Sequence, residues 1–246
     1  MTNRRSHSKH RLYVDEPLAV DTQITLPIEA THYLLRVLRL RDGAAITLFN
    51  GDGYNYLAQV NKPQGKQLVL DVAARETGPV RATPLLVLAL PLLKGERMDY
   101  ALQKATELGV DQVHLFLAAR SDVKLTGDRL VKRLLHWQRV VRSASEQSGR
   151  TRLPELLPAV TFEEMLKATA EMNRYVFEPT ADAGTIEPSE LPICSIVGPE
   201  GGFEERELNQ LEQHCTLLSF GDLTLRAETA PVVALTLANL VRGKLA

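Results

Sequence analysis

The sequence predicts a two-domain protein in which a small β-barrel precedes an α/β domain with a parallel sheet. Short apolar runs alternate with turn signals up to about residue 75, which is typical of a small all-β domain. Two prolines and one glycine within residues 76–84 indicate a linker. After it, strand-like runs alternate with longer helical patterns, as in βαβ units. We therefore place the domains at residues 1–78 and 79–246, each long enough for a core.

The N-terminal domain is expected to contain short strands and one short helix. Turn signals such as Arg41-Asp42-Gly43 and Asn50-Gly51-Asp52-Gly53 separate the apolar runs. The helix is expected over residues 29–38, where it interrupts the β-like pattern. The expected strands cover residues 12–14, 24–26, 45–49, 54–60 and 67–73.

The C-terminal domain is expected to alternate strands and helices around a parallel sheet. Pro231 fits the first turn of the last helix, where a missing N–H costs little. The expected strands cover residues 85–90, 112–117, 174–177, 193–197 and 216–220. The expected helices cover residues 95–108, 127–147, 161–172, 204–214 and 229–243.

The helix expected at residues 127–147 has one apolar stripe and one basic side. Spacings of four and three residues put the apolar side chains on one face. The basic side is either an RNA-facing surface or an ordinary solvated face, and the helix taken alone favours the solvated face. The stripe consists of Leu130, Leu134, Trp137, Val141 and Ala144, and the other side holds Lys132, His136 and Arg139.

Charge is unevenly distributed along the chain, although the formal net charge is only −1. Residues 1–41 hold 7 Lys/Arg against 4 Asp/Glu, and residues 120–152 hold 9 against 3. Residues 153–246 hold 6 against 15. Because local positive charge neutralises phosphates whatever the total, the two basic stretches keep RNA binding open.

Several classes of protein are excluded by what the sequence lacks. No apolar run approaches the roughly 20 residues that span a bilayer, and residues 1–7 lack the apolar core of a signal peptide, so we expect a cytosolic protein without a membrane contact. Cys194 and Cys215 have no ligand spacing and are expected to be small buried side chains. The six histidines are scattered, and GxSxG is absent, so neither a catalytic metal nor the commonest serine hydrolase is expected.

Two glycine-containing loops carry the sharpest chemical signal. Residues 195–203 read as a buried strand that enters the loop Gly198-Pro199-Glu200-Gly201-Gly202 before a helix. Such a loop allows backbone N–H groups to approach a ligand, although a plain strand-to-helix turn would look the same. A second strand, loop and helix follow at residues 217–230, with Arg226 at the mouth of the loop. Glu228 is expected to assist the N-terminus of the last helix through its dipole.

Several motifs, in order along nearly the whole chain, resemble the 16S ribosomal RNA (uracil-N3)-methyltransferase family of the SPOUT class. The N-terminal elements at residues 10–14 and 32–39 resemble that family as well. The motifs are Lys94-Gly95-Glu96-Arg97-Met98-Asp99, residues 103–110, residues 146–150, Val197 to Phe203, and Leu225-Arg226-Ala227-Glu228-Thr229-Ala230.

The resemblance implies a PUA-like N-terminal barrel and a SPOUT domain whose chain ends form a deep trefoil knot. It also implies a homodimer, the 16S ribosomal RNA or 30S subunit as partner, and S-adenosylmethionine as cofactor. Leu223 stands where relatives usually have an arginine, so the resemblance carries no electrostatic role over to this position. By motif position the cofactor-binding residues are Phe177, Glu178, Pro179, Gly198, Pro199, Glu200, Gly201, Gly202, Leu218, Phe220, Gly221, Leu223 and Leu225.

The implied reaction is methylation of a uridine at N3, for which Arg226 is the expected catalytic residue. Its guanidinium would stabilise the negative charge that spreads onto the uracil carbonyl oxygens when the N3 proton leaves. Glu200 either accepts that proton or shapes its loop, and solvent is a third acceptor. The residues expected to bind RNA are Arg11, Arg36, Arg39 and Arg150.

Two other functions remain open at this point. A non-catalytic RNA-binding or ribosome-assembly factor would have the same basic stretches, but it would not need two glycine loops. A ribose 2′-O-methyltransferase of the same superfamily would share the cofactor and differ in its product. A plain nucleotide-binding enzyme has neither a dinucleotide fingerprint nor a phosphate loop to support it.

Overall fold

The chain folds into two compact units in the computed structural model, which describes residues 10–61, 66–80, 82–123, 127–182 and 184–244. The first unit holds the residues up to Val80 together with Ser145–Arg152, and the second holds the rest. Each unit has its own sheet and its own buried core. Residues 1–9 of the predicted first domain and Arg81 of the predicted linker lie outside the described residues.

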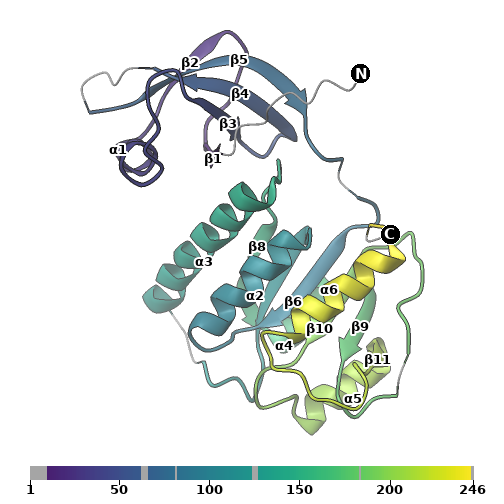
Figure 1. Cartoon of the computed structure of the whole chain (residues 1–246). Coiled ribbons are helices and arrows are strands. Elements are labelled where there is room, and N and C mark those ends of the chain that lie inside the picture. The colour runs from purple at the N-terminus through teal and green to yellow at the C-terminus, as the bar shows by residue number, and fades with distance from the viewer. Residues whose placement is uncertain (1–9, 62–65, 81, 124–126, 183, 245–246) are drawn as a thin grey trace. The chain divides into compact units, whose positions relative to one another are not determined.

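The first unit contains a five-stranded sheet with the order β1-β3-β4-β5-β2 (Figure 1). β1 is parallel to β3, and the other neighbours are antiparallel. Buried aliphatic side chains such as Leu26, Leu48 and Leu70 form its core. The strands are β1 (Arg11–Tyr13), β2 (Thr22–Thr25), β3 (Ala45–Phe49), β4 (Tyr54–Val60) and β5 (Val69–Thr77).

The helix predicted over residues 29–38 is present at residues 28–37, but only its first half is α-helical. It begins as α1 (Ile28–His32) and continues as one π-helical turn, η1 (Tyr33–Val37), in which the N–H of Leu38 donates to the carbonyl of Tyr33 at 3.0 Å. Arg39 follows with φ of 55°, a left-handed conformation that cannot continue a helix. Arg36, within η1, and Arg39, beyond its end, therefore do not share one helix face.

The second unit contains a six-stranded, all-parallel sheet with the order β11-β9-β10-β6-β7-β8 (Figure 1). β7 and β8 follow β6 in the sequence and extend the sheet on one side of it. The later strands β9, β10 and β11 form the other side. The strands are β6 (Leu86–Pro91), β7 (Gln112–Leu117), β8 (Glu155–Thr161), β9 (Asn173–Phe177), β10 (Ile193–Val197) and β11 (Thr216–Leu218).

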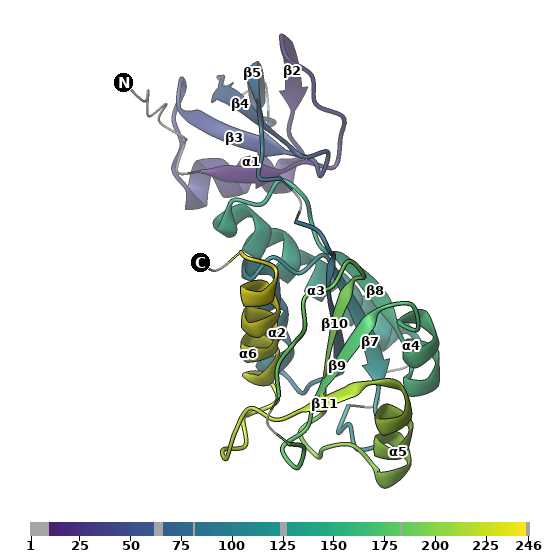
Figure 2. The ribbon, with the colours of Figure 1, turned by 90° about the vertical axis from the view of Figure 1, so that its right-hand side faces the viewer.

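Helices cover both faces of this sheet, with α2 and α6 on one face and α4 and α5 on the other (Figure 2). α3 packs on the same face as α2 and α6. A parallel sheet needs this double cover because its strands are apolar on both faces. The helices are α2 (Glu96–Glu107), α3 (Gly127–Ser148), α4 (Phe162–Ala168), α5 (Glu205–His214) and α6 (Ala230–Val241).

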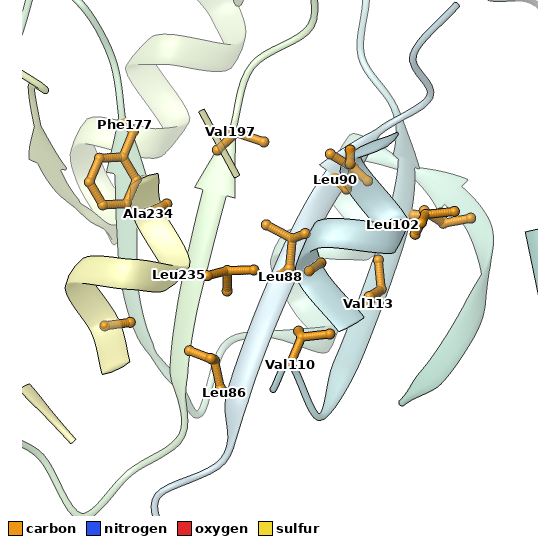
Figure 3. Close-up of a cluster of buried hydrophobic side chains, with 14 of the residues drawn as sticks. Leu86, Leu88, Leu90, Leu102, Val110, Val113, Phe177, Val197, Ala234 and Leu235 are labelled. Atoms are coloured by element: carbon orange, nitrogen blue, oxygen red, sulfur yellow. The ribbon is translucent and has the colours of Figure 1, made fainter. Parts of the chain in front are cut away.

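Alternate residues of β6 point to the two faces. Leu86, Leu88 and Leu90 belong to the core under α2 and α6, while Val87 and Ala89 belong to the core under α4 and α5. Figure 3 shows the first of these cores around β6. The apolar stripe predicted on α3 is confirmed, because Leu130, Leu134, Trp137 and Val141 belong to or pack against the same core and Ala144 is buried.

A buried ion pair fastens the end of α6 to the start of the sheet. Nη2 of Arg242 lies 3.6 Å from Oδ2 of Asp111, and both side chains are almost fully buried. The same guanidinium donates to the carbonyl of Ala82 at 3.2 Å, and Oδ2 of Asp111 accepts from the N–H of Leu86 at 2.9 Å. These bonds compensate the cost of burying the two charges and hold the last helix against β6 and β7.

Several predicted boundaries are corrected by the structure. β8 is missing from the prediction because Pro158 lies within it; a proline is tolerated there since β8 is at the edge of the sheet. β5 runs to Thr77 and so enters the predicted linker, β11 ends at Leu218, and α4 ends at Ala168.

Within the described part of the chain, no helix is long and apolar enough to cross a bilayer.

Replacing Leu88 by alanine should lower the free energy of unfolding of the second unit by about 2–5 kcal/mol, because a fully buried side chain leaves a cavity. Urea unfolding followed by the fluorescence of the buried Trp137, the chain's one tryptophan, measures this change. Val80→Ala is the matched control, since Val80 is 83% exposed. Equal unfolding curves for both variants would show that β6 is not the centre of this core.

Candidate functional site

A pocket of about 310 Å³ opens at the carboxyl ends of the parallel strands in the second unit. The loops after β9, β10 and β11 form most of its wall, and α2 contributes one side chain. Ligands of open α/β sheets bind at this edge, where the strand order reverses. The lining residues are Arg97, Phe177, Glu178, Pro179, Gly198, Pro199, Glu200, Gly202, Phe220, Thr224, Leu225, Arg226, Ala227, Glu228 and Ala230.

The loop between β10 and α5 is a tight turn that needs its glycines. The N–H of Gly202 donates to the carbonyl of Pro199 at 3.0 Å, and Gly202 has φ of 68°, which a larger residue adopts only with strain. A Cβ at Gly201 would lie 3.0 Å from the backbone oxygen of Arg120. A Cβ at Gly198 would lie 3.2 Å from the ring of Phe203. The backbone of the turn is therefore packed closely on its inner side and open toward the pocket.

An aromatic pair lies at the side of the pocket formed by β9 and β11. The rings of Phe177 and Phe220 are stacked, with centroids 4.3 Å apart and planes 7° from parallel. The N–H of Glu178 donates to the carbonyl of Leu218 at 2.9 Å, which fixes the ends of the two strands against each other. The pair gives the pocket a flat apolar wall beside its polar loops.

Four charged side chains of alternating sign line the polar side of the pocket. Oε1 of Glu200 accepts from the N–H of Lys94 and from Nη1 of Arg97, both at 3.3 Å. Nε of Arg97 lies 3.8 Å from Oε2 of Glu228, and Nη1 of Arg226 lies 4.0 Å from Oε1 of the same carboxylate. The side chains of Glu200 and Glu228 are only 17% and 15% exposed, whereas that of Arg226 is 79% exposed.

One oxygen of each glutamate, Oε2 of Glu200 and Oε2 of Glu228, is buried without a hydrogen-bond partner among the described residues. Thr229, the N-cap of α6, makes no side-chain capping hydrogen bond, and Glu228, expected to assist the helix N-terminus through its dipole, directly precedes it. The carboxylate of Glu228 lies beside Arg97 and Arg226. Buried oxygens of this kind are free to bind a positively charged or hydrogen-bond-donating ligand.

The structure brings most of the residues predicted from the two loops to this one pocket. Leu218 is buried in the core, Leu223 is 79% exposed, and neither they nor Gly201 and Gly221 line the pocket. The predicted residues that do line it are Phe177, Glu178, Pro179, Gly198, Pro199, Glu200, Gly202, Phe220, Leu225 and the expected catalytic residue Arg226.

Sequence reasoning missed five lining residues as site residues, of which Arg97 and Glu228 carry charge. Arg97 comes from the first turn of α2, directly after β6, the strand next to β10. Its position after a central strand was a usable signal, because the carboxyl ends of parallel strands meet at one edge. The other three are Thr224, Ala227 and Ala230.

The predicted RNA-binding residues all belong to the first unit. Arg36 and Arg39 are exposed. Arg11 is half-buried: Nη1 donates to Oδ1 of Asn55 at 2.9 Å and Nη2 to the carbonyl of Arg150 at 2.8 Å. Burial lowers the pKa of Arg11, and the carboxylate of Glu146 opposes this shift. Arg11 thus holds the segment that carries Arg150, whose own Nε donates to the carbonyl of Arg152.

Other reactive groups of the second unit lie away from the pocket. Burial raises the pKa of Cys194 to about 12 and that of Cys215 to about 11, so neither thiol is a nucleophile near neutral pH. Burial also lowers the pKa of His114, a residue within β7. Among the described residues, no group of three or more His, Cys, Asp or Glu could hold a metal ion.

Comparisons with known proteins agree on one family. The family model of an RNA methyltransferase domain matches residues 81–239, and that of an RNA methyltransferase PUA domain matches residues 27–73. The chain is 32% identical over 235 residues to the ribosomal RNA small subunit methyltransferase E of Bacillus subtilis, covering 87% of this chain and 90% of that protein.

Two solved structures are similar over 96% of this chain and 98% of theirs. One is the ribosomal RNA small subunit methyltransferase E of Neisseria gonorrhoeae bound to S-adenosyl methionine, with a TM-score of 0.86 and 32% identity. The other is a Legionella pneumophila protein in complex with the same cofactor, with a TM-score of 0.87 and 29% identity. Both the fold and the sequence therefore point to the same group of proteins.

Proposed function

Because the chain belongs to the ribosomal RNA small subunit methyltransferase E family, we propose that it transfers a methyl group from S-adenosylmethionine to N3 of a uridine in 16S ribosomal RNA. The observation that carries the proposal is the pocket of about 310 Å³ at the carboxyl edge of the parallel sheet. The loops after β9, β10 and β11 all line this pocket, although the sequence motifs identify them one by one.

The residues of the pocket fit a cofactor that is an adenosine joined to a charged amino acid. The stacked Phe177 and Phe220 offer an apolar wall for a purine or a methylene chain. The turn at Gly198 to Gly202 lets the backbone approach a ligand closely. The unpartnered Oε2 atom of Glu200 suits a positive charge of the cofactor, which carries a sulfonium and an ammonium group. When bound, the cofactor supplies an activated methyl group on a positively charged sulfur.

The protein's own contribution is to orient the uridine and to stabilise charge. Arg226 lies at the mouth of the pocket, where its guanidinium is exposed and able to reach a base outside. As N3 loses its proton, negative charge spreads onto the two uracil carbonyl oxygens, and a guanidinium beside one of them favours that anion. Since in-line displacement at a methyl group needs little further chemistry, positioning should account for much of the remaining rate.

We assign capture of the RNA to the first unit, which contains the PUA-like part of the chain, and chemistry to the second unit. The predicted bounds of 1–78 and 79–246 differ from these units chiefly in that Ser145–Arg152 belongs to the first one. Arg36 and Arg39 are exposed cations near α1, and neither forms an ion pair or a hydrogen bond with an acid among the described residues. They are available to contact phosphates. Arg11 acts indirectly, because its guanidinium holds the backbone of Arg150 in place.

We further propose a homodimer, with a trefoil knot in the second unit and a cytosolic location where small ribosomal subunits are found. A second copy is supported by apolar side chains exposed on the neighbouring helices α2 and α6. Tyr100, Leu237 and Leu240 are 45%, 37% and 51% exposed, and large apolar side chains exposed together on neighbouring helices favour an interface with another protein. Sedimentation equilibrium at twice the 27.3 kDa chain mass would support this assembly.

The proposed reaction is tested with methyl-labelled S-adenosylmethionine and either naked 16S RNA or 30S subunits that lack the modification. Label mapped by mass spectrometry to uridine N3 is the expected result. Label on a ribose would replace the proposal with 2′-O-methylation. Neither label nor cofactor binding in calorimetry would favour an RNA-binding assembly factor.

Replacing Arg226 by alanine should lower the single-turnover methylation rate by about 10²–10³-fold, as loss of one oxyanion donor usually does. Calorimetry should show unchanged cofactor affinity, because the guanidinium is directed to the mouth of the pocket. Arg206→Ala, an exposed arginine on α5, is the matched control. Near-normal methylation by the Arg226 variant would remove this residue from the mechanism.

Changing Arg36 and Arg39 together to glutamate should weaken RNA binding and flatten its dependence on salt. Each lost phosphate contact reduces the slope of log K against log salt by about 0.7–0.9. Filter binding at several salt concentrations measures this slope, with Arg206→Glu as the control. An unaltered slope would make both arginines ordinary surface charges.

A further inference from the structure

We propose that Glu228 is the carboxylate that accepts the proton from uridine N3, and that it pairs with Arg226 to recognise the N3–H and carbonyl edge of uracil. This inference rests on the proposed function and names the proton acceptor that the sequence leaves open between Glu200 and solvent. Four observations about the pocket carry it, and the proposed step balances chemically.

The first observation separates Glu228 from the other carboxylates of the pocket. Oε1 of Glu178 accepts from the hydroxyl of Thr180 at 3.4 Å. Oε1 of Glu200 accepts from a backbone N–H and a guanidinium. No described residue donates a hydrogen bond to either oxygen of Glu228, since its two guanidinium neighbours are 3.8 and 4.0 Å away. Both oxygens of Glu228 are therefore free to take a proton, whereas only Oε2 of Glu200 is free.

The second observation is that Glu228 is buried but electrically balanced. Its side chain is only 15% exposed, so an isolated charge there would be costly. Arg97 faces Oε2 from α2, and Arg226 faces Oε1 from the same loop. The other charged groups lining the pocket are Glu200 from the loop after β10 and Glu178 from the loop after β9. The two guanidinium groups therefore offset the charge of this carboxylate at its largely buried position.

The third observation assigns Glu200 a different task. Its Oε1 accepts from the N–H of Lys94 and from the guanidinium of Arg97. Glu200 therefore links the loop after β10 to the start of α2. Arg97 in turn stands between Glu200 and Glu228. Arg97 is thus a positioning residue that holds both carboxylates, and Glu200 shapes the loop.

The fourth observation is the pairing of an acceptor with a donor at the mouth of the pocket. Oε1 of Glu228 and Nη1 of Arg226 are 4.0 Å apart. Uracil presents a donor at N3 between two carbonyl acceptors, so Glu228 can face N3–H while Arg226 faces a carbonyl oxygen. Cytosine has an acceptor at N3 and would meet the carboxylate with a lone pair. An unpaired buried polar group of this kind discriminates strongly between substrates.

Atoms, electrons and charges balance in the proposed step. The N3–H bond breaks and its proton goes to Oε1 of Glu228, while the electron pair stays on N3. That pair forms the bond to the methyl carbon as the carbon–sulfur bond breaks, and the electrons of the broken bond remain on sulfur. The reactants are a cationic donor, a neutral uridine and a carboxylate, and the products are all neutral. No oxidant, reductant or metal is needed.

Glu228→Gln should lower the single-turnover rate by about 10²–10⁴-fold, the usual contribution of a positioned base. The ratio of wild-type to variant rate should shrink as pH rises into the alkaline range, because uridine N3 then ionises in solution and needs no acceptor. Calorimetry should show unchanged cofactor affinity, and filter binding should show unchanged RNA affinity. Glu212→Gln, an exposed carboxylate of α5, is the matched control for the loss of one acid.

A defect that is equal at all pH values, or that is explained by lost cofactor or RNA binding, would overturn the role of Glu228 as acceptor. In that case wild-type enzyme would still produce N3-methyluridine, so the proposed function would stand. A wild-type enzyme that leaves uridine N3 unmethylated would overturn the proposed function and this inference together. Glu200→Gln separates the two carboxylates, since a loop-shaping residue should give a defect that pH does not relieve.

Discussion

The constraint on which the second unit depends is that a parallel sheet must be covered on both faces. Its strands bury side chains on both sides, as alternate residues of β6 do, and each crossover between parallel strands has to travel back over a face. The loops that leave the strands are therefore gathered at one edge. The pocket is a direct result, because four segments distant in sequence must meet there whatever their side chains are.

The sequence predicts elements well where one periodicity dominates a segment. The bounds of β3, β4, β7 and β10 agree with the prediction, since each is an apolar run flanked by turn residues. The sequence does not predict β8, because Pro158 interrupts its β pattern. The proline is tolerated because β8 is an edge strand. The π-helical turn is also hidden, because apolar spacing alone does not distinguish it from an α-helix. Its sign in the structure is the bond from Leu38 to Tyr33.

The site shows a similar division between local and distant information. The glycine turn is readable because glycine itself signals unusual backbone, and Gly202 has a positive φ. The partnership of Arg97 with Glu200 and Glu228 joins positions more than a hundred residues apart, so no local pattern reports it. Negative and positive side chains alternate along this side of the pocket, so each guanidinium offsets the charge of a neighbouring carboxylate. Both glutamates can therefore be largely buried in one pocket.

The short segment Ser145–Arg152 limits how far the two parts of this protein are interchangeable modules. The backbone N–H of Tyr13 donates to Glu146, Arg11 holds the carbonyl of Arg150, and Arg152 donates to the carbonyl of Gly51. The N-terminal domain is thus completed by residues encoded in the middle of the catalytic one. Exchange of a leading domain between related genes by recombination at the linker would leave these donors and acceptors unmatched. Recombination would preserve these contacts only if the N-terminal domain and Ser145–Arg152 were exchanged together. The two parts should therefore share one evolutionary history.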